Sequence, residues 1–316
     1  MKRIIALILS VLMLLSLAAC GGEETPAPTE PTVATTVPIQ ETDEPTAAPT
    51  DAATEPGETV PVMAETVLAD NENVTFTVKS AEFSEHVGLQ LQVQCVNKTD
   101  RNLMFSWDMV SVCGYMFDPM WAEEVAAGKT ANSTVSFDTY QLEKMGIASV
   151  DEISFTLRIY DSENWMEAPL VQEAFTVYPT GLNAETLNLP PREEMGGQAV
   201  VAEDENVRFI IEWADAEDTE EYTVYVYMEN KTDRNLMYAW DMVSVNGFMV
   251  DPFWSATVAA GKKAVDTVTF YRSDLEANGI ETVSEIEFTL TVSDYDNWEA
   301  DYLVNTVFTY LPVSVG

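Results

Sequence analysis

The chain has 316 residues, and its 53 Asp and Glu outnumber 15 Lys and Arg to give a formal net charge of −38. That balance argues against nucleic acid as a partner, because binding to DNA or RNA depends on cationic contacts with phosphate, and it disfavours docking on anionic lipid. The single histidine, His86, rules out a His-based metal cluster. At about 100–200 residues per domain, the length fits two domains plus extra segments.

The first 20 residues form an export signal. Lys2 and Arg3 precede an apolar run, 4–17, which at roughly 14 residues is shorter than the about 20 needed to span a membrane. The LAAC sequence at 17–20 resembles the lipobox of bacterial lipoproteins, which implies removal of a signal peptide, 1–19, and a diacylglyceryl group on Cys20. We therefore expect a protein anchored by its N-terminal lipid on the outer face of the cell membrane of a Gram-positive-type bacterium. The alternative is a plain secretory signal with an incidental cysteine.

Residues 20–66 have the composition of a disordered stalk. Between 21 and 66 there are eight prolines, eleven threonines and ten acids, with no Lys, Arg or aromatic residue. Such a segment cannot bury enough apolar surface to offset the entropy lost on ordering. Its flexible reach is on the order of 35–40 Å. We expect a spacer, with O-glycosylation of the Thr-Pro sequence as the alternative.

The remainder of the chain is a tandem repeat without gaps. Residues 97–104 (NKTDRNLM) recur letter for letter at 230–237, and 107–112 (WDMVSV) recur at 240–245, both 133 positions later. Conservation between the copies is uneven: 24 of 33 positions match over 97–129, but only 4 of 23 over 74–96. The first of these segments is either a binding surface used twice or the folding core.

Each copy is predicted to be β-structure. Apolar and polar residues alternate at 88–96 and 153–159, the period of a half-buried strand. Further strands are expected at 73–79, 103–112, 132–137 and 170–178, each with an equivalent 133 residues later. Short helices are expected at 139–145 and 273–278, each followed by a glycine, and Asn246-Gly247 predicts a tight hairpin turn.

These elements predict an all-β fold of two tandem immunoglobulin-like β-sandwich domains, each with one short helix, after the disordered stalk. The expected boundaries are 67–179 for the first sandwich, 180–199 for a Pro- and Gly-containing linker and 200–316 for the second. A small β-barrel is the alternative.

The motifs of the copies resemble those of a known class of proteins. The succession of NKTDRNL, VSVNG, VAAGK and a short helix ending in Gly-Ile is similar to the immunoglobulin-like extracellular domains of unknown function in Gram-positive secreted lipoproteins. These domains are related in fold to mycobacterial secreted immunogenic antigens. The resemblance covers both copies but not the stalk. It implies a β-sandwich and an extracellular location, and it brings no catalytic residues.

The cysteines and the histidine do not indicate an enzyme. If strands 88–96 and 103–113 form a hairpin about Asp100, Cys95 and Cys113 lie on the order of 26 Å apart, beyond disulfide range. Both are therefore expected to be free thiols. His86 lies beside an expected turn, and no nearby residues would make it a catalytic base. Carboxylates are so abundant in this chain that finding two of them is no evidence for a glycosidase. We expect no enzymatic activity and no cofactor, with calcium as the exception considered next.

Two acidic loops and several aromatic residues are the candidate sites. Alternating carboxylates and amides could give oxygen ligands to Ca²⁺, although the EF-hand pattern is not met and Asx turns need no metal. The calcium candidates are Asp161, Glu163, Asn164, Asp294, Asp296 and Asn297. Aromatic side chains in loops can stack on sugars or anchor a protein, or they can close the ends of a sandwich. The candidate ligand-binding residues are Tyr115, Trp121, Trp165, Phe248, Trp254 and Trp298.

The function expected from the sequence is a lipid-anchored, non-enzymatic binding or adhesion module of the cell surface, with a glycan or a surface protein as ligand. A structural or scaffolding lipoprotein, stabilised by calcium at the acidic loops, is the alternative.

Overall fold

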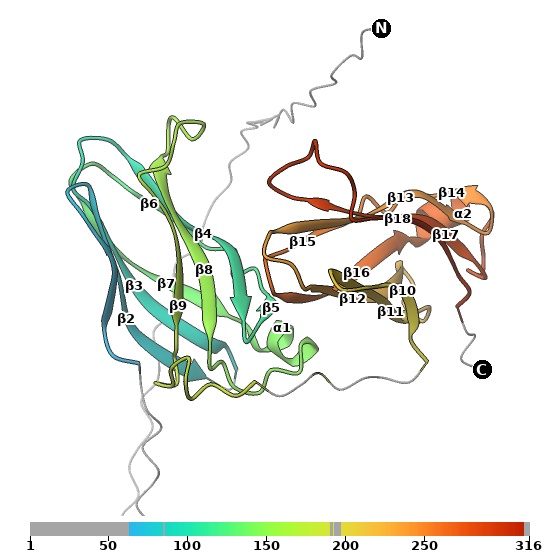
Figure 1. Cartoon of the computed structure of the whole chain (residues 1–316), viewed down its shortest axis with the longest axis horizontal. Helices are drawn as coiled ribbons and strands as arrows, with labels where there is room; N and C mark the ends of the chain where they lie inside the picture. Colours follow the sequence, from blue (N-terminus) through green and yellow to red (C-terminus); the bar gives the residue numbers. More distant parts are fainter. Residues whose placement is uncertain (1–62, 85, 190–191, 193–196, 313–316) are drawn as a thin grey trace, which may run out of the picture. The chain divides into compact units, whose positions relative to one another are not determined.

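Strands with alternating side chains account for most of the structure. The computed structural model describes residues 63–84, 86–189, 192 and 197–312, and is shown in Figure 1. Sandwich-like sheets and two short helices make up the described part, so the prediction of a mostly β fold is confirmed. The signal peptide, Cys20 and the stalk up to residue 62 lie outside the described residues.

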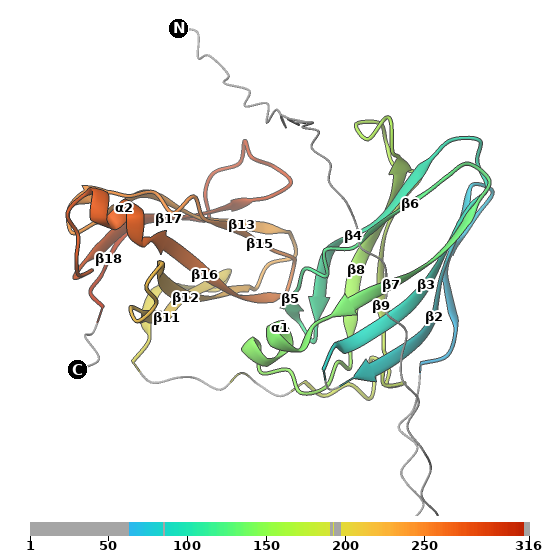
Figure 2. The same ribbon diagram turned by 180° about the vertical axis from the view of Figure 1, so that it is seen from behind.

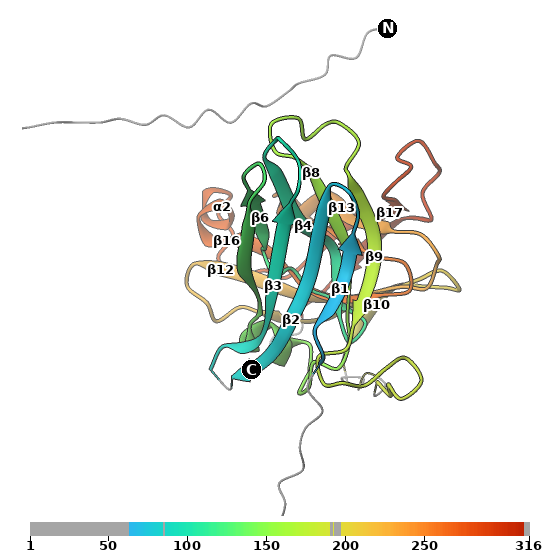
Figure 3. The ribbon, with the colours of Figure 1, turned by 90° about the vertical axis from the view of Figure 1, so that its left-hand side faces the viewer.

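The first copy forms two groups of antiparallel strands. One sheet has the order β1 (Thr66–Asp70), β2 (Val74–Ser84), β3 (Gly88–Asn97) and β7 (Thr130–Phe137). Figure 3 shows β1, β2 and β3 side by side. The other group has the order β5 (Tyr115–Met116), β4 (Leu103–Val112), β8 (Ile153–Asp161) and β9 (Val171–Val177), with β6 (Ala122–Val125) also paired to β4. Helix α1 is Thr139–Lys144.

The second copy repeats this arrangement. One group has the order β10 (Ala199–Glu203), β11 (Val207–Asp215), β12 (Glu221–Asn230) and β16 (Lys263–Tyr271). The other has β14 (Phe248–Met249), β13 (Leu236–Val245), β17 (Ile286–Asp294) and β18 (Val304–Tyr310), with β15 (Ser255–Val258) paired to β13. Helix α2 is Arg272–Ala277. Figure 2 shows the labelled strands from behind.

Strand register is also conserved between the copies. Trp107 pairs with Leu157 in the first copy, and Trp240 pairs with Leu290 in the second. Both pairs of strands shift register immediately afterwards, between Asp108 and Ser111 and between the equivalent residues 241 and 244. The ungapped sequence repeat is therefore an ungapped structural repeat.

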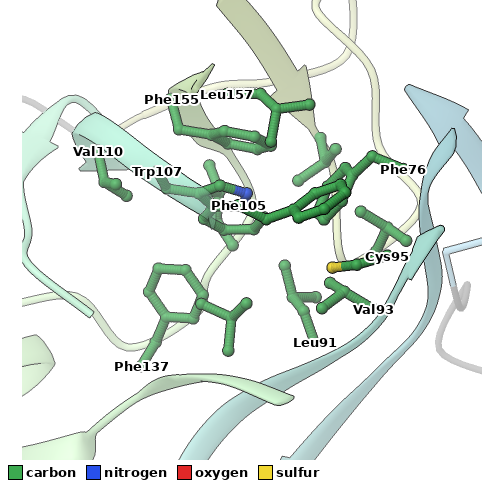
Figure 4. Packing of buried hydrophobic residues seen from close by; sticks show 14 of the residues in the cluster. Phe76, Leu91, Val93, Cys95, Phe105, Trp107, Val110, Phe137, Phe155 and Leu157 are labelled. Carbon is green, nitrogen blue, oxygen red and sulfur yellow. The ribbon is translucent and has the colours of Figure 1, made fainter. Parts of the chain in front are cut away.

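Each copy has its own hydrophobic core between its two groups of strands. The indole of Trp107 stacks on Phe155 at 3.7 Å between ring centroids, and Trp240 stacks on Phe288 at 3.8 Å. Figure 4 shows the side chains of the first core pointing toward one another from strands of both sheets. These buried stacks fill the space between the sheets, because large aromatic rings bury the most apolar area per residue.

Two expectations about local structure are wrong. Strands β3 and β4 do not form a hairpin about Asp100, because β3 pairs with β2 and β7 while β4 pairs with β5, β6 and β8. The chain instead crosses from one sheet to the other at this turn. The expected stalk also extends too far, since Met63 is buried against the first core and β1 begins at Thr66.

The expected helices and the tight turn are confirmed. Helix α1 is followed by Gly146 at φ +70° and α2 by Gly279 at φ +72°, the left-handed conformation that ends many helices. Asn246 and Gly247 have φ of 49° and 83° and join β13 to β14, as a two-residue hairpin turn requires.

The described residues fall into one compact unit. A parallel bridge between Lys263 of β16 and Tyr115 of β5 pairs strands of the two copies. Within the described part, no helix is both long enough and apolar enough to cross a membrane.

Candidate functional site

Trp121 and Trp254 belong to the cores rather than to an open surface. The ring centroid of Trp121 lies 5.6 Å from that of Trp107, and Trp254 lies 5.9 Å from Trp240. Both indoles are half-buried, and their Nε1–H groups donate to side chains on the strand opposite. The acceptors are Ser133 Oγ at 3.1 Å and Asp266 Oδ2 at 3.0 Å. In this geometry each tryptophan closes one end of a core.

Tyr115 and Phe248 occupy equivalent positions in the short strands β5 and β14 but differ in exposure. Tyr115 is half-buried, and Lys263 Nζ lies 5.9 Å from its ring centroid. Phe248 is 49% exposed. The same fold position therefore presents an open aromatic ring in the second copy only.

Trp165 and Trp298 are the candidate aromatics that point most fully into solvent. Trp165 is 61% exposed and lies in the loop after β8, and Trp298 is 84% exposed and lies in the loop after β17. Met166, next to Trp165, is 84% exposed. The two loops therefore display one indole each at matching positions of the repeat.

An aspartate carboxylate at the start of each loop fixes the conformation of the loop that carries the exposed tryptophan. Asp161 Oδ1 accepts the backbone N–H groups of Glu163 at 2.9 Å and Asn164 at 3.3 Å. Asp294 Oδ1 accepts those of Asp296 and Asn297 at 3.0 and 3.1 Å. These are Asx turns, which fix a loop without a ligand.

An arginine from a distant turn also binds each of these carboxylates. Arg101 Nη1 lies 3.1 Å from Asp161 Oδ2, and Arg234 Nη1 lies 3.1 Å from Asp294 Oδ2. The backbone N–H of Glu163, together with Asn164 and Arg101, lowers the pKa of Asp161. Two of the carboxylates proposed for calcium, Asp161 and Asp294, are thus already engaged with protein donors. Among the described residues, no group of three or more His, Cys, Asp or Glu side chains could hold a metal ion.

Two exposed apolar residues that the sequence patterns missed lie beside the buried tryptophans. Met120 is 89% exposed and Phe253 is 91% exposed, and both have φ near +50°. The side chains of Asp118 and Asp251 accept their backbone N–H groups at 2.7 and 2.8 Å. The Asp-Pro dipeptide before each residue was the available signal, because it favours a turn that lifts the next side chain out of the sheet.

The candidate nucleophiles lie in inert surroundings. Cys95 and Cys113 are free thiols, and burial raises the pKa of Cys95 to about 12. Burial also raises the pKa of Cys113. Since a thiolate is the reactive form of cysteine, neither group is activated. His86 is exposed in the turn after β2, where its backbone N–H donates to Ser84 Oγ at 3.3 Å.

Comparisons with known proteins do not identify a family for this chain. No family model and no curated protein sequence matches the chain. The solved structures with some likeness include two mutants of the Bacillus subtilis oxalate decarboxylase OxdC, at 9% and 10% identity with TM-scores of 0.11 and 0.10. Each alignment covers 80% of this chain and 78% of the decarboxylase chain. A likeness at this level carries no argument about fold or activity.

Proposed function

We propose that the protein is a lipid-anchored, non-enzymatic binding or adhesion module of the bacterial cell surface, with a glycan or a surface protein as ligand. Two tandem immunoglobulin-like β-sandwiches, 67–179 and 200–316, follow the signal peptide and the stalk. The lipobox-like ending at Cys20 and the resemblance to Gram-positive lipoprotein domains support the location and the fold type.

The observation that carries the binding proposal is the pair of exposed indoles, Trp165 and Trp298, at equivalent positions of the two copies. An exposed tryptophan face stacks on the apolar side of a sugar ring or anchors a partner side chain. Two such sites on one chain engage a repetitive ligand together, and such linkage raises apparent affinity by about 10²–10⁴. The Asx turns at Asp161 and Asp294 hold both loops before any ligand arrives.

A glycan array probed with the wild-type chain and with a Trp165→Ala/Trp298→Ala variant tests this proposal. We expect a bound glycan for the wild type and at least a tenfold loss for the double variant, with smaller losses for each single change. Tyr140→Ala is the matched control, because Tyr140 is an aromatic residue of similar exposure (65%) in α1, outside both loops.

A glycan signal that survives the double change would move the binding site elsewhere. A blank array would favour the protein ligand, or the structural role. The buried Trp121 and Trp254 are unsuitable for this test, because truncating a core aromatic costs about 3–5 kcal/mol of stability and would reduce binding indirectly.

A further inference from the structure

One edge of the first copy is bonded to the second copy through its backbone and an ion pair. The N–H of Lys263 donates to the carbonyl oxygen of Gly114 at 2.9 Å, beside the bridge between Lys263 and Tyr115. Lys262 Nζ lies 3.4 Å from Glu152 Oε1, with both side chains mostly buried. Strand β5 and the residue before β8 thus form a contact edge, defined here as Gly114, Tyr115, Met116 and Glu152.

Met116 gives this contact an apolar centre. Its side chain packs against the core cluster of the second copy, and its Sδ accepts the N–H of Ala259 at 3.4 Å. The surface that receives the edge is therefore made of Ala259, Lys262 and Lys263, which we call the receiving surface.

The second copy carries the same edge, and the described part of the chain leaves its side chains exposed. The equivalent residues, 133 positions later, are Gly247, Phe248, Met249 and Glu285. Phe248 is 49% exposed, Met249 is 62% exposed and Glu285 is exposed, whereas Tyr115, Met116 and Glu152 are all half-buried. The glycine, the methionine and the glutamate are retained, and tyrosine is replaced by another aromatic residue.

The first copy carries the complementary receiving surface, also open. Its residues are Ala126, Lys129 and Thr130, equivalent to Ala259, Lys262 and Lys263. All three are exposed, whereas their counterparts in the second copy are half-buried. The lysine that forms the ion pair and the alanine that meets the methionine are both retained. Only Lys263 is changed, to threonine; its backbone N–H bonds Gly114, and its Nζ lies 5.9 Å from the Tyr115 ring centroid.

We infer that the occupant of the open edge is a second copy of this chain. The edge formed by Gly247, Phe248, Met249 and Glu285 of one chain docks on Ala126, Lys129 and Thr130 of the next, with Glu285 pairing with Lys129. Each chain keeps one open edge and one open receiving surface, so the association is head to tail and does not close at a dimer. This association is independent of ligand binding by Trp165 and Trp298.

The proposed contact between two chains is small, so we expect their affinity to be low. A few residues on each side bury much less than the roughly 1,600 Å² of a standard interface, so association between free chains is weak and depends on concentration. Within one chain the linker supplies a high effective concentration, which is why the same contact is made there. A net charge of −38 on each chain also opposes association at low salt, so added salt strengthens it.

Sedimentation velocity of the chain from residue 21 onward tests the inference, because this chain keeps every described residue and lacks the anchoring cysteine. Over a range from about 5 to about 500 µM in moderate salt, we expect monomers to give way to dimers and longer species. Met249→Glu blocks the edge and Lys129→Glu blocks the receiving surface, and each alone is expected to weaken association at least tenfold.

Mixing the two blocked variants gives the decisive result. The intact edge of the Lys129→Glu chain meets the intact receiving surface of the Met249→Glu chain, so the mixture forms dimers and nothing longer. Combining Lys129→Glu with Glu285→Lys restores growth. Met166→Glu is the control, because it places the same charge on another exposed methionine, 84% exposed against 62% for Met249, away from the edge. Wild-type chains that stay monomeric, single variants that associate as tightly as the wild type, or a mixture that stays monomeric would each overturn the inference.

Discussion

The hydrogen-bond acceptor of the indole distinguishes the two half-buried tryptophans, Trp121 and Trp254. The Trp121 indole donates to a serine hydroxyl, Ser133, whereas the Trp254 indole donates to a carboxylate, Asp266. Burial raises the pKa of Asp266 above its ordinary value, which its hydrogen bonds with Thr267 and Trp254 offset only in part. The second copy therefore places a carboxyl group, whose charged form burial disfavours, where the first copy has a hydroxyl group.

Replacing this carboxylate by Asp266→Asn should stabilise the protein at pH 7. Because the pKa of Asp266 is higher in the folded than in the unfolded chain, the folded state binds the proton more tightly and loses stability as pH rises through the folded value. We expect the melting temperature of the variant to exceed that of the wild type by a few degrees at pH 7.

The same comparison at lower pH checks the cause. The advantage should shrink as pH falls, and vanish below the ordinary pKa of an aspartic acid, where the wild-type side chain is protonated in both states. Asp266→Ser, which copies Ser133 of the first repeat, is a second variant that removes the charge. A gain that stays constant with pH would mean that packing, and not charge, is responsible.

The local pattern placed these tryptophans near a turn but left open whether they bind a ligand or close the ends of the sandwich. Trp121 and Trp254 follow Asp-Pro turns, and such turns occur at a surface. Whether a side chain after the turn folds back depends on the size of the gap at the end of the core, which residues distant in the sequence define. Met120 and Phe253 show the converse, since their apolar side chains look like core residues by composition but lie in solvent.

The repeated segment NKTDRN acts as a connector between the two sheets of each copy. Asn97 is 1% exposed, and its Nδ2 donates to the carbonyl oxygens of Arg101 at 2.7 Å and Val125 at 2.8 Å. Lys98 Nζ bonds the turn between β1 and β2, and Asn102 Oδ1 accepts the N–H of Ala127. These bonds supply a structural reason for the identity of this segment between the copies.

Asn97→Ala should therefore destabilise the first copy. The change leaves a buried carbonyl oxygen without a donor and removes the acceptor of Thr99, so we expect a loss of about 2–4 kcal/mol in the free energy of unfolding. Asn132→Ala, which truncates an exposed asparagine on β7, is the control and should cost well under about 1 kcal/mol. Urea denaturation followed by tryptophan fluorescence measures both. Equal losses for the two variants would contradict the connector role.

The long strands with alternating apolar and polar residues were predictable from the sequence, and the shortest strands were not. The periods at 88–96 and 153–159 gave β3 and β8 nearly to the residue. Strands β5 and β6 have two and four residues, too few for alternation to show. The wrong hairpin about Asp100 arose because the turn residues resemble those of any hairpin. The bond from Asn97 Nδ2 to the carbonyl oxygen of Val125, which ties this turn to the other sheet, joins residues 28 positions apart.

At the scale of the whole molecule, the dominant property is the net charge of −38. Folding brings these charges together, so self-repulsion destabilises the compact state and salt should relieve it. We expect the melting temperature to rise between low salt and about 0.5 M NaCl, where the Debye length falls to a few ångströms.

Melting in the presence of calcium tests whether the acidic loops bind this ion specifically. Since Asp161 and Asp294 are already bound by Arg101 and Arg234, CaCl₂ and MgCl₂ at equal ionic strength should raise the melting temperature equally, and EDTA should have no further effect. A rise specific to Ca²⁺ at micromolar concentration would restore the calcium-stabilised alternative.

The exposed methionines make the surface of the molecule sensitive to oxidants. Met120, Met166, Met242 and Met249 are each more than half exposed, while Met228 is buried and the thiol of Cys95 is held in its unreactive form. A peroxide would convert the exposed thioethers to polar sulfoxides and leave the cores intact. At Met249 this conversion would place a polar group at the centre of the edge proposed to join one chain to the next. An oxidant would then separate assembled chains without unfolding them, and a methionine sulfoxide reductase would reverse the effect.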